Sequence, residues 1–318
     1  MITESEFNPA WWLKNRHWQT MWPSLFRTRE TLPLDKERLE LPDGDFLDLA
    51  WMPDHAGDLC LILHGLEGTL QSHYAPGLIK AASDAGKHVV FMHLRGCSGE
   101  PNRLPRRYHS GDTSDLRYML ELLKRKYPDK QIHVVGVSLG GNILLKYLGE
   151  SGNESLVESA IAISVPFDLA IAAETLDRGT AKIYQRHLLN SLQSALMLKS
   201  QVVDLQIKIP EKKQIDTLYE FDDLITAPIH GFASADDYYT RSSSRQFIPA
   251  IRTPTLILHA IDDPFMTPSA IPGEKEIPSD VTLELSQAGG HVGFISGSLP
   301  FRPTYWLDHR VKAFLQSG

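Results

Sequence analysis

The sequence feature that most constrains the fold is an alternation, from residue 59 onward, of short apolar runs with longer amphipathic segments. A strand buried on both faces of a parallel sheet reads as such a run, because neither face meets water. The segments between runs are long enough for the crossover helices that parallel strands require. Strands are predicted at Leu59–Leu63, His88–His93, Ile132–Val137, Ser159–Ser164, Thr255–His259 and Val281–Leu285, and helices at Ala75–Ala85, Thr113–Tyr127, Asn142–Leu148 and Tyr305–Leu315.

An antiparallel hairpin is predicted ahead of this alternation. Glu37–Leu41 and Phe46–Met52 read as two strands joined at Pro42-Asp43-Gly44. Proline presets one backbone angle of such a turn, and glycine allows the other. Together with the alternation, the hairpin predicts a doubly wound α/β fold: a mostly parallel twisted sheet with helices on both faces.

Length and composition indicate one elaborated domain. With 318 residues, of which 42% are hydrophobic, the chain can bury a single large core. We therefore predict one domain over residues 1–318 that begins with an aromatic arm at about residues 1–35. Four tryptophans occur in this arm, and we favour packing of the arm across the domain over a role as an acyl groove or lipid contact; they are Trp11, Trp12, Trp18 and Trp22.

Charge and cysteine usage narrow the possible partners and the compartment. The net charge of −7 argues against nucleic acid or anionic lipid as a partner, since the summed field repels both. The basic residues Arg103, Arg106 and Arg107 are interpreted as a solvated loop rather than an anion site. Cys60 and Cys97 are too few to staple a secreted domain, so free thiols in a reducing compartment are expected. With no signal peptide or transmembrane segment evident, we expect a cytoplasmic protein.

Residues 134–142 carry the pattern Gly136-x-Ser138-x-Gly140 between a predicted strand and a predicted helix. A serine hydroxyl is a poor nucleophile and must stand on a sharp turn that a base can reach. Such a turn strains the backbone at Ser138 and crowds the helix against the strand, so that only glycine fits on either side. Ser138 is therefore the candidate nucleophile.

A base and an orienting acid follow later in the chain. His291 lies in the Gly-flanked stretch 288–294 after a predicted strand, and Asp262 and Asp263 follow another predicted strand. We favour Asp263 as the acid, because it stands immediately before a short Pro-containing turn, and we expect Asp262 to brace the loop. The order Ser, Asp, His is that of the α/β-hydrolase triad.

The oxyanion donors are predicted from the loop after the first strand of the alternation. The backbone N–H groups of Leu66 and of Leu139, the residue after the nucleophile, can point at one spot. His64 is interpreted as a brace for that loop rather than as the base. His-Glu-x-x-His and Cys-x-x-Cys patterns are missing from the sequence, so no metal and no cofactor are predicted.

The alternation fails between about residues 167 and 248, where helix-forming stretches such as Ala181–Leu198 occur. This segment is predicted to be an insertion between late strands, whose carboxyl ends lie on the side of Ser138. Two interpretations remain open: a cap over the site, or extra helices that cover a sheet face.

These residues resemble the α/β-hydrolase superfamily and, within it, the YheT-type esterases, which are related to eukaryotic ABHD-type lipid esterases. The resemblance covers nearly the whole chain and rests on the following stretches: 15–20, 64–68, 94–99, 108–113, 136–142, 262–264 and 290–293. It implies a carboxylic ester hydrolase with Ser138, Asp263 and His291 as the charge-relay set.

The resulting hypothesis is a cofactor-free serine esterase that forms an acyl-enzyme and acts on a small-molecule ester with an apolar acyl chain. Acyl transfer to an alcohol would use the same residues. A non-catalytic binding protein on the same fold is the alternative from a different class.

Overall fold

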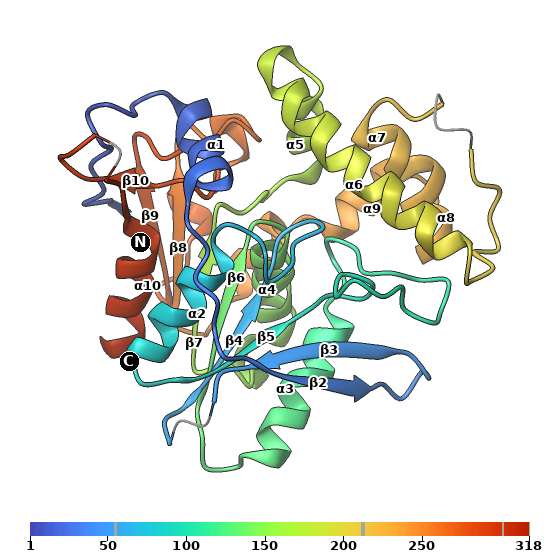
Figure 1. Ribbon diagram of the computed structural model, residues 1–318, viewed down its shortest axis with the longest axis horizontal. Helices are drawn as coiled ribbons and strands as arrows, with labels where there is room; N and C mark the ends of the chain where they lie inside the picture. Colours follow the sequence, from blue (N-terminus) through green and yellow to red (C-terminus); the bar gives the residue numbers. More distant parts are fainter. Residues whose placement is uncertain (54–55, 211–213, 301, 318) are drawn as a thin grey trace.

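The computed structural model describes residues 1–53, 56–210, 214–300 and 302–317. Its centre is a nine-stranded sheet with the strand order β1-β9-β8-β7-β6-β4-β5-β3-β2 (Figure 1). The strands of this sheet are β1 (Ile2–Glu4), β2 (Asp35–Glu40), β3 (Phe46–Trp51), β4 (Leu59–Leu63), β5 (His88–Met92), β6 (Ile132–Val137), β7 (Ser159–Ile163), β8 (Thr255–Ala260) and β9 (Val281–Ser286). A separate two-stranded ribbon pairs β10 (Ile295–Ser296) with β11 (Thr304–Tyr305). The α-helices are α1 (Arg16–Phe26), α2 (Ala75–Asp84), α3 (Ser114–Lys126), α4 (Leu139–Ser151), α5 (Leu169–Leu176), α6 (Lys182–Ser200), α7 (Leu218–Phe221), α8 (Ala227–His230), α9 (Ala235–Ser242) and α10 (Trp306–Ser317).

Strand directions follow the sequence prediction closely. The seven strands β1, β9, β8, β7, β6, β4 and β5, which are neighbours in this order, run parallel. At the edge beyond β5, β3 runs antiparallel to β5, and β2 runs antiparallel to β3. The predicted hairpin is therefore confirmed. Strand β1 was not predicted: three residues of the N-terminal arm extend the sheet beside β9. A strand this short carries too little periodicity to be recognised without its partner.

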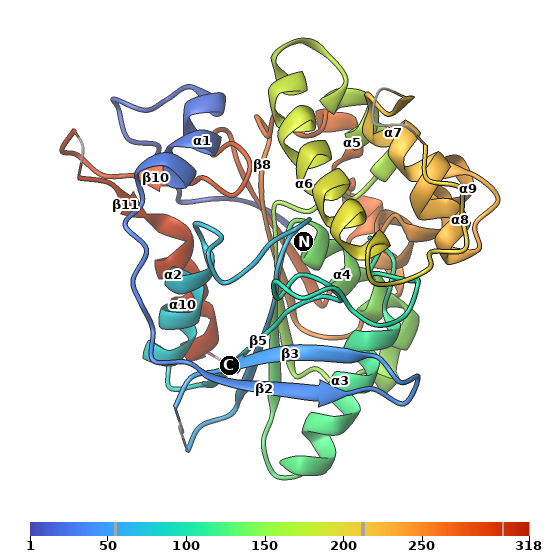
Figure 2. The same ribbon diagram turned by 45° about the vertical axis from the view of Figure 1, so that its right-hand side comes forward.

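Side chains alternate between the two faces of the central strands, as the pleat requires. In β4, Leu59, Leu61 and Leu63 join the core under α3 and α4, whereas Cys60 and Ile62 join the core under α2 and α10. Figures 1 and 2 show α2 and α10 side by side on one face and α3 and α4 on the other. The predicted sheet with helices on both faces is confirmed.

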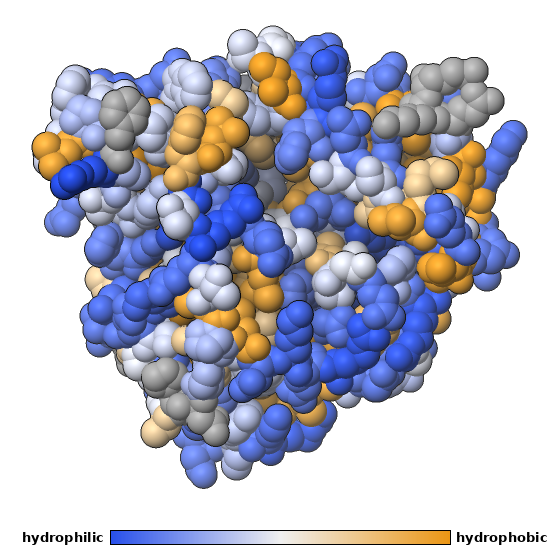
Figure 3. Space-filling model, viewed as in Figure 1, coloured by the Kyte–Doolittle hydropathy of each residue, from blue (hydrophilic) through white to orange (hydrophobic). Residues whose placement is uncertain are grey.

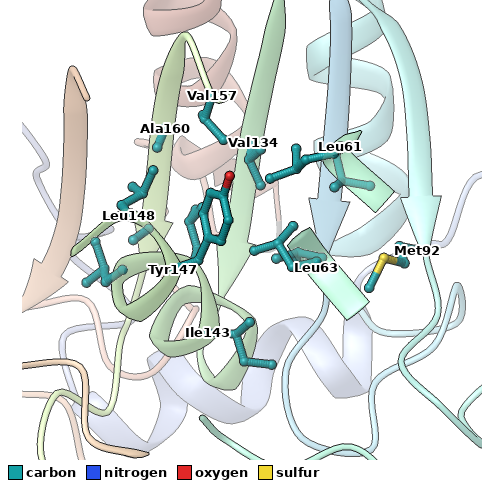
Figure 4. Close-up of a cluster of buried hydrophobic side chains, with 14 of the residues drawn as sticks. Leu61, Leu63, Met92, Val134, Ile143, Tyr147, Leu148, Val157 and Ala160 are labelled. Carbon is teal, nitrogen blue, oxygen red and sulfur yellow. The ribbon is translucent and has the colours of Figure 1, made fainter. Parts of the chain in front are cut away.

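Helix α4 is packed directly onto the strands that it follows. Its Tyr147 ring lies fully buried among side chains of β4, β6 and β7 (Figure 4). The neighbouring side chains labelled in the figure are Leu61, Leu63, Val134, Ile143, Leu148, Val157 and Ala160. This packing holds the start of α4 against the end of β6, where the candidate nucleophile lies.

Helices α5 to α9 occur between β7 and β8, and we refer to residues 169–242 as the helical insertion. It has an apolar cluster of its own, which includes Leu189, Leu192 and Phe221. The insertion lies above the sheet on the side opposite α2 and α10 (Figure 1). It also leaves large apolar side chains exposed, including Met197 and Leu224, and Figure 3 shows hydrophobic residues gathered over this region.

Candidate active site

Ser138 stands between the last residue of β6 and the first of α4, with φ 52° and ψ −116°. This backbone conformation is unfavourable for a residue with a Cβ. A Cβ on Gly136 would lie 2.6 Å from the carbonyl oxygen of Gly140, and one on Gly140 would lie 2.6 Å from the carbonyl oxygen of His64. The two glycines are therefore required by close approach of backbone, as their spacing predicts.

Three side chains from distant parts of the chain form one hydrogen-bonded line. The distance from Ser138 Oγ to His291 Nε2 is 3.0 Å, and the distance from His291 Nδ1 to Asp263 Oδ2 is 2.8 Å. A carboxylate accepts the proton on Nδ1, which leaves Nε2 free to accept from the serine hydroxyl. The arrangement has the geometry of a nucleophile, a base and an orienting acid.

The two neighbouring aspartates have different partners. Asp263 is almost completely buried, and its other oxygen accepts the Phe265 N–H at 2.8 Å. Asp262 accepts the backbone N–H of Gly290 at 3.0 Å and does not touch the imidazole. Burial raises the pKa of the Asp262 carboxyl. Asp263 is therefore the aspartate that contacts the imidazole, and Asp262 ties its own loop to the histidine loop.

The histidine loop is held by residues that sequence reasoning did not assign to the site. Thr20 Oγ1, on α1, accepts the His291 N–H at 2.9 Å, and Ser164 Oγ accepts the Val292 N–H at 3.0 Å. The Phe265 ring stacks on the imidazole with centroids 3.8 Å apart and planes within 5°. Helix α1 of the N-terminal arm thus positions the candidate base, and Thr20 belongs to one of the stretches that carry the family resemblance.

The loop after β4 lies against the serine turn. The parallel register places Leu63 beside Gly136, and a Cβ on Gly65 would lie 3.2 Å from Ser138 Cβ. Among the hydrogen bonds of the described residues, none engages the N–H of Leu66 or of Leu139. Both amides are therefore available as donors beside the serine.

His64 is fully buried and does not contact the serine hydroxyl. Its Nδ1 donates to the carbonyl of Gly65 over 2.7 Å, and its Nε2 accepts the Leu94 N–H over 2.9 Å. Burial lowers the pKa of His64 to about 3, so the ring is neutral. These contacts join the loop after β4 to the loop after β5, which is the bracing role that the sequence predicts.

A cavity of about 610 Å³ opens beside Ser138 and His291. Its lining comes partly from the loops at the sheet edge and partly from the helical insertion, and most of it is apolar. From the insertion, Leu188, Leu192 and Ile225 face this space. A volume in this range suits a small organic ligand bound largely through apolar contacts.

The insertion also brings polar groups to the cavity wall. The Asp222 carboxylate accepts from Thr226 Oγ1 at 2.7 Å and from Tyr239 Oη at 2.8 Å, at a π-helical turn (Asp222–Thr226). Burial raises the pKa of Asp222 to about 6. Lys199, whose pKa burial lowers to about 7, donates to the backbone carbonyl of Arg106 at 3.1 Å and so ties α6 to the core.

The interpretation of the arginine cluster as a solvated loop is wrong for Arg107. Its guanidinium is mostly buried at the cavity wall and lies 3.0 Å from the Glu67 carboxylate. Arg103 pairs with Glu40, and Arg106 pairs with Asp112 over 2.6 Å. All three cations are thus compensated by carboxylates. The sequence could not reveal the pairs of Arg103 and Arg107, because Glu40 and Glu67 come from other segments.

Cys60 and Cys97 are free and buried, and burial raises the pKa of both to about 12. Within the described ranges, His, Cys, Asp and Glu side chains do not gather into a group of three that could hold a metal ion. None of the helices in those ranges combines the length and apolarity needed to cross a bilayer.

A family comparison agrees with this fold. Residues 59–298 match the family model described as the alpha/beta hydrolase fold. The chain belongs to the α/β-hydrolase family, and the resemblance stated from the sequence is confirmed. The solved structure of the Pyrococcus furiosus esterase Pf2001 shares the fold, with a TM-score of 0.59 and 18% identity over 92% of this chain and 98% of that one.

Within that family, the chain is similar to curated proteins that are named as enzymes. It is 44% identical to the Escherichia coli (strain K12) protein named "Putative esterase YheT", over 98% of this chain and 94% of that protein. It is 30% identical to Mus musculus phospholipase ABHD3, over 100% of this chain and 79% of that protein. The Saccharomyces cerevisiae monoacylglycerol lipase is 33% identical over 76% of this chain and 56% of that protein. The fold and these relatives identify the chain as a hydrolase.

Proposed function

We propose that the protein hydrolyses carboxylic esters through an acyl-enzyme formed on Ser138. The observation that carries the proposal is the hydrogen-bonded line from Ser138 through His291 to Asp263, which opens onto a mostly apolar cavity. A non-catalytic binding protein would have no use for a strained serine turn kept in line with a base and a buried acid.

In the first half of the reaction, Ser138 Oγ attacks the ester carbonyl carbon while His291 Nε2 takes the hydroxyl proton. The carbonyl electron pair moves to the oxygen, and the amides of Leu66 and Leu139 stabilise the resulting oxyanion. The imidazolium then gives its proton to the departing alkoxide, which leaves as an alcohol. Asp263 stabilises the imidazolium and keeps the proton of the resting ring on Nδ1.

In the second half, water attacks the acyl-enzyme by the same route. His291 removes a proton from the water, and a second tetrahedral oxyanion forms at the same amides. Collapse of this intermediate breaks the bond to Ser138 Oγ, which recovers its proton from the imidazolium. The products are a carboxylic acid, an alcohol and free enzyme.

The substrate class that we propose is a small-molecule ester with an apolar acyl chain. Apolar side chains of the helical insertion provide most of one cavity wall, and burial of each methylene group there contributes about 0.8 kcal/mol. The relatives named as a phospholipase and a monoacylglycerol lipase support an acyl ester as substrate. The helical insertion then acts as a cap over the site.

Turnover of p-nitrophenyl esters and labelling by a fluorophosphonate probe test the proposal together. Ser138→Ala is expected to abolish labelling and to lower kcat by on the order of 10⁶-fold, because the attacking atom is gone. Ser194→Ala, which changes an exposed serine on α6, is the matched control and is expected to behave like the wild type. Retained turnover in pure Ser138→Ala protein, or failure of the folded wild type to label, contradicts the proposal.

A further inference from the structure

The loop after β4 contains three consecutive backbone amides that differ in their hydrogen-bond acceptors. The Gly65 N–H donates to Tyr74 Oη over 2.8 Å, and the Glu67 N–H donates to Tyr108 Oη over 2.7 Å. The N–H of Leu66, which lies between them, is the one that none of the described residues accepts. Two buried phenol oxygens thus occupy the flanking amides.

Tyr108 forms two hydrogen bonds with Glu67, one to its backbone and one to its side chain. Its oxygen accepts the Glu67 N–H, and its own O–H donates to Glu67 Oε1 over 2.6 Å. A phenol has a single proton to donate, so this donation fixes the orientation of the lone pairs that receive the amide. Burial raises the pKa of Tyr108 well above its usual value, so the phenol keeps that proton.

The backbone held in this way is strained. Glu67 has φ 50°, in the left-handed region that residues with a Cβ rarely adopt. The turn is closed by the Gly68 N–H, which donates to the Gly65 carbonyl over 3.0 Å. Strained conformations persist where surrounding contacts over-determine them, and the two tyrosines supply such contacts here.

The Glu67 carboxylate would itself oppose negative charge developing nearby. Glu67 lines the same cavity as Leu66 and Ser138, so its charge lies near the site proposed for the oxyanion. Arg107 lies 3.0 Å from this carboxylate and compensates its charge. Tyr108 and Arg107 together therefore both shape the loop and limit the electrostatic cost of an acid beside the oxyanion site.

We propose that Tyr74 and Tyr108 are positioning residues of the oxyanion hole: by occupying the amides of Gly65 and Glu67, they orient the Leu66 N–H toward the substrate carbonyl at Ser138. This inference rests on the proposed esterase function and assigns roles to two side chains that lie outside the triad. Both tyrosines line the cavity, and among the described residues neither forms a hydrogen bond to Ser138, His291 or Asp263. Both act through the backbone between them.

The test compares three Tyr-to-Phe variants that remove only a hydroxyl. Tyr74→Phe and Tyr108→Phe each remove the acceptor of a loop amide. Tyr147→Phe is the matched control, because the buried Tyr147 Oη also accepts a backbone N–H, that of Leu156 over 3.5 Å, but on the far part of α4. Removal of an oxyanion donor costs about 10²–10³-fold in kcat, and a misplaced donor is expected to cost somewhat less.

We expect kcat to fall about 10- to 100-fold in Tyr108→Phe and about 10-fold in Tyr74→Phe, with KM changed less than about threefold. The affinity for a boronic acid, whose tetrahedral adduct mimics the oxyanion, should fall in parallel with kcat/KM. Affinity for an uncharged ether analogue of the substrate should stay constant. A change in folding alone would lower the amount of active enzyme without producing this split, and thermal unfolding of each variant measures it directly.

The results for the wild type and for the loop variants test the esterase proposal and the positioning role separately. If wild type turns over esters, Ser138→Ala does not, and both loop variants keep wild-type kcat and boronic acid affinity, the positioning role is overturned and the esterase proposal survives. If the wild type fails to turn over or label, the esterase proposal fails and the inference falls with it. Should Tyr108→Phe not fold, Tyr74→Phe alone decides the question by the same readouts.

Discussion

Two parts of the wall around the cavity beside Ser138 differ in construction. One, which we call the sheet wall, consists of the loops at the carboxyl ends of the strands, residues 64–68, 138–139, 263–265 and 290–292. The other is the helical insertion. On the sheet wall, hydrogen bonds connect each loop to another loop or helix, as from His291 to Thr20 or from Gly290 to Asp262. On the insertion, short helices present mainly apolar side chains to the cavity, and several apolar groups remain exposed on its outer side.

Under the proposed function, this difference separates the requirements of catalysis from those of substrate choice. Proton transfer and oxyanion stabilisation depend on atoms held within a few tenths of an ångström, which strained turns and cross-linked loops provide. Recognition of an acyl chain depends on volume and apolar area, which tolerate substitution of one apolar side chain for another. Changes on the sheet wall should therefore act on kcat, and changes on the insertion should act on stability and on preference between substrates.

After Ser138→Ala, the largest effect is expected from Asp263→Asn on the sheet wall. The Phe265 N–H needs an acceptor, so the new amide should turn its oxygen toward Phe265 and its NH₂ toward His291. The imidazole would then carry its proton on Nε2 and could not accept from Ser138. We expect kcat for a p-nitrophenyl ester to fall about 10⁴-fold, with the fold unchanged.

Asp262→Asn is the matched control for this experiment. An amide oxygen still accepts the Gly290 N–H, and no contact with the imidazole is lost. We expect kcat to stay within about tenfold of wild type. Equal losses in the two variants would show that Asp263 does not differ from Asp262 in its effect on the base, and the assignment of Asp263 would be wrong.

A smaller effect, on stability rather than chemistry, is expected from Asp222→Asn in the insertion. Burial raises the pKa of Asp222 to about 6 in the folded protein, above the ordinary value of 3.8. Between these values the folded state holds a proton that the unfolded state has released, so this group's contribution to stability is present below pH 3.8 and is lost as pH rises through 6. Relative to Asp222→Asn, the wild type should lose about 2 kcal/mol of unfolding free energy between pH 4 and pH 7.

Urea unfolding of both proteins across this pH range measures the difference. Asp236→Asn, which changes an exposed carboxylate on α9, should parallel the wild type at every pH. A constant offset between Asp222→Asn and wild type would show that the Asp222 carboxyl titrates alike in the folded and unfolded states. Asp222 would then make no pH-dependent contribution to stability that sets the helical insertion apart from the sheet wall.

The smallest effect is expected from Leu188→Ala, also in the insertion. Removing this side chain from the cavity wall weakens contact with a long acyl chain but leaves the triad untouched. We expect the ratio of kcat/KM for long-chain to short-chain p-nitrophenyl esters to change about tenfold, with kcat for the shortest ester unchanged. Leu198→Ala, on the exposed side of α6, should leave the ratio unchanged. An equal loss for every ester would indicate that the insertion also supports the chemistry.

Much of the fold could be read from local pattern. The predicted strand Leu59–Leu63 coincides with β4, because a fully buried parallel strand has an unmistakable apolar signature. Short elements were missed: β1 has three residues, and its hydrogen bonds all go to β9 near the other end of the chain. The helical insertion was recognised as a break in the alternation, but its π-helical turn at Asp222–Thr226 has no local signal.

The sequence by itself determined the order of strands and helices, the glycine spacing around Ser138 and the three side chains of the candidate triad. Steric limits on a tight turn and the periodicity of burial act within a few residues. They can therefore be recognised in a short stretch of sequence. Tertiary structure alone decided that Thr20 binds the His291 amide across 271 positions, and that Tyr74 and Tyr108 occupy the amides around Leu66. Such contacts depend on how packed layers bring distant segments together, and the local pattern of neither partner encodes them.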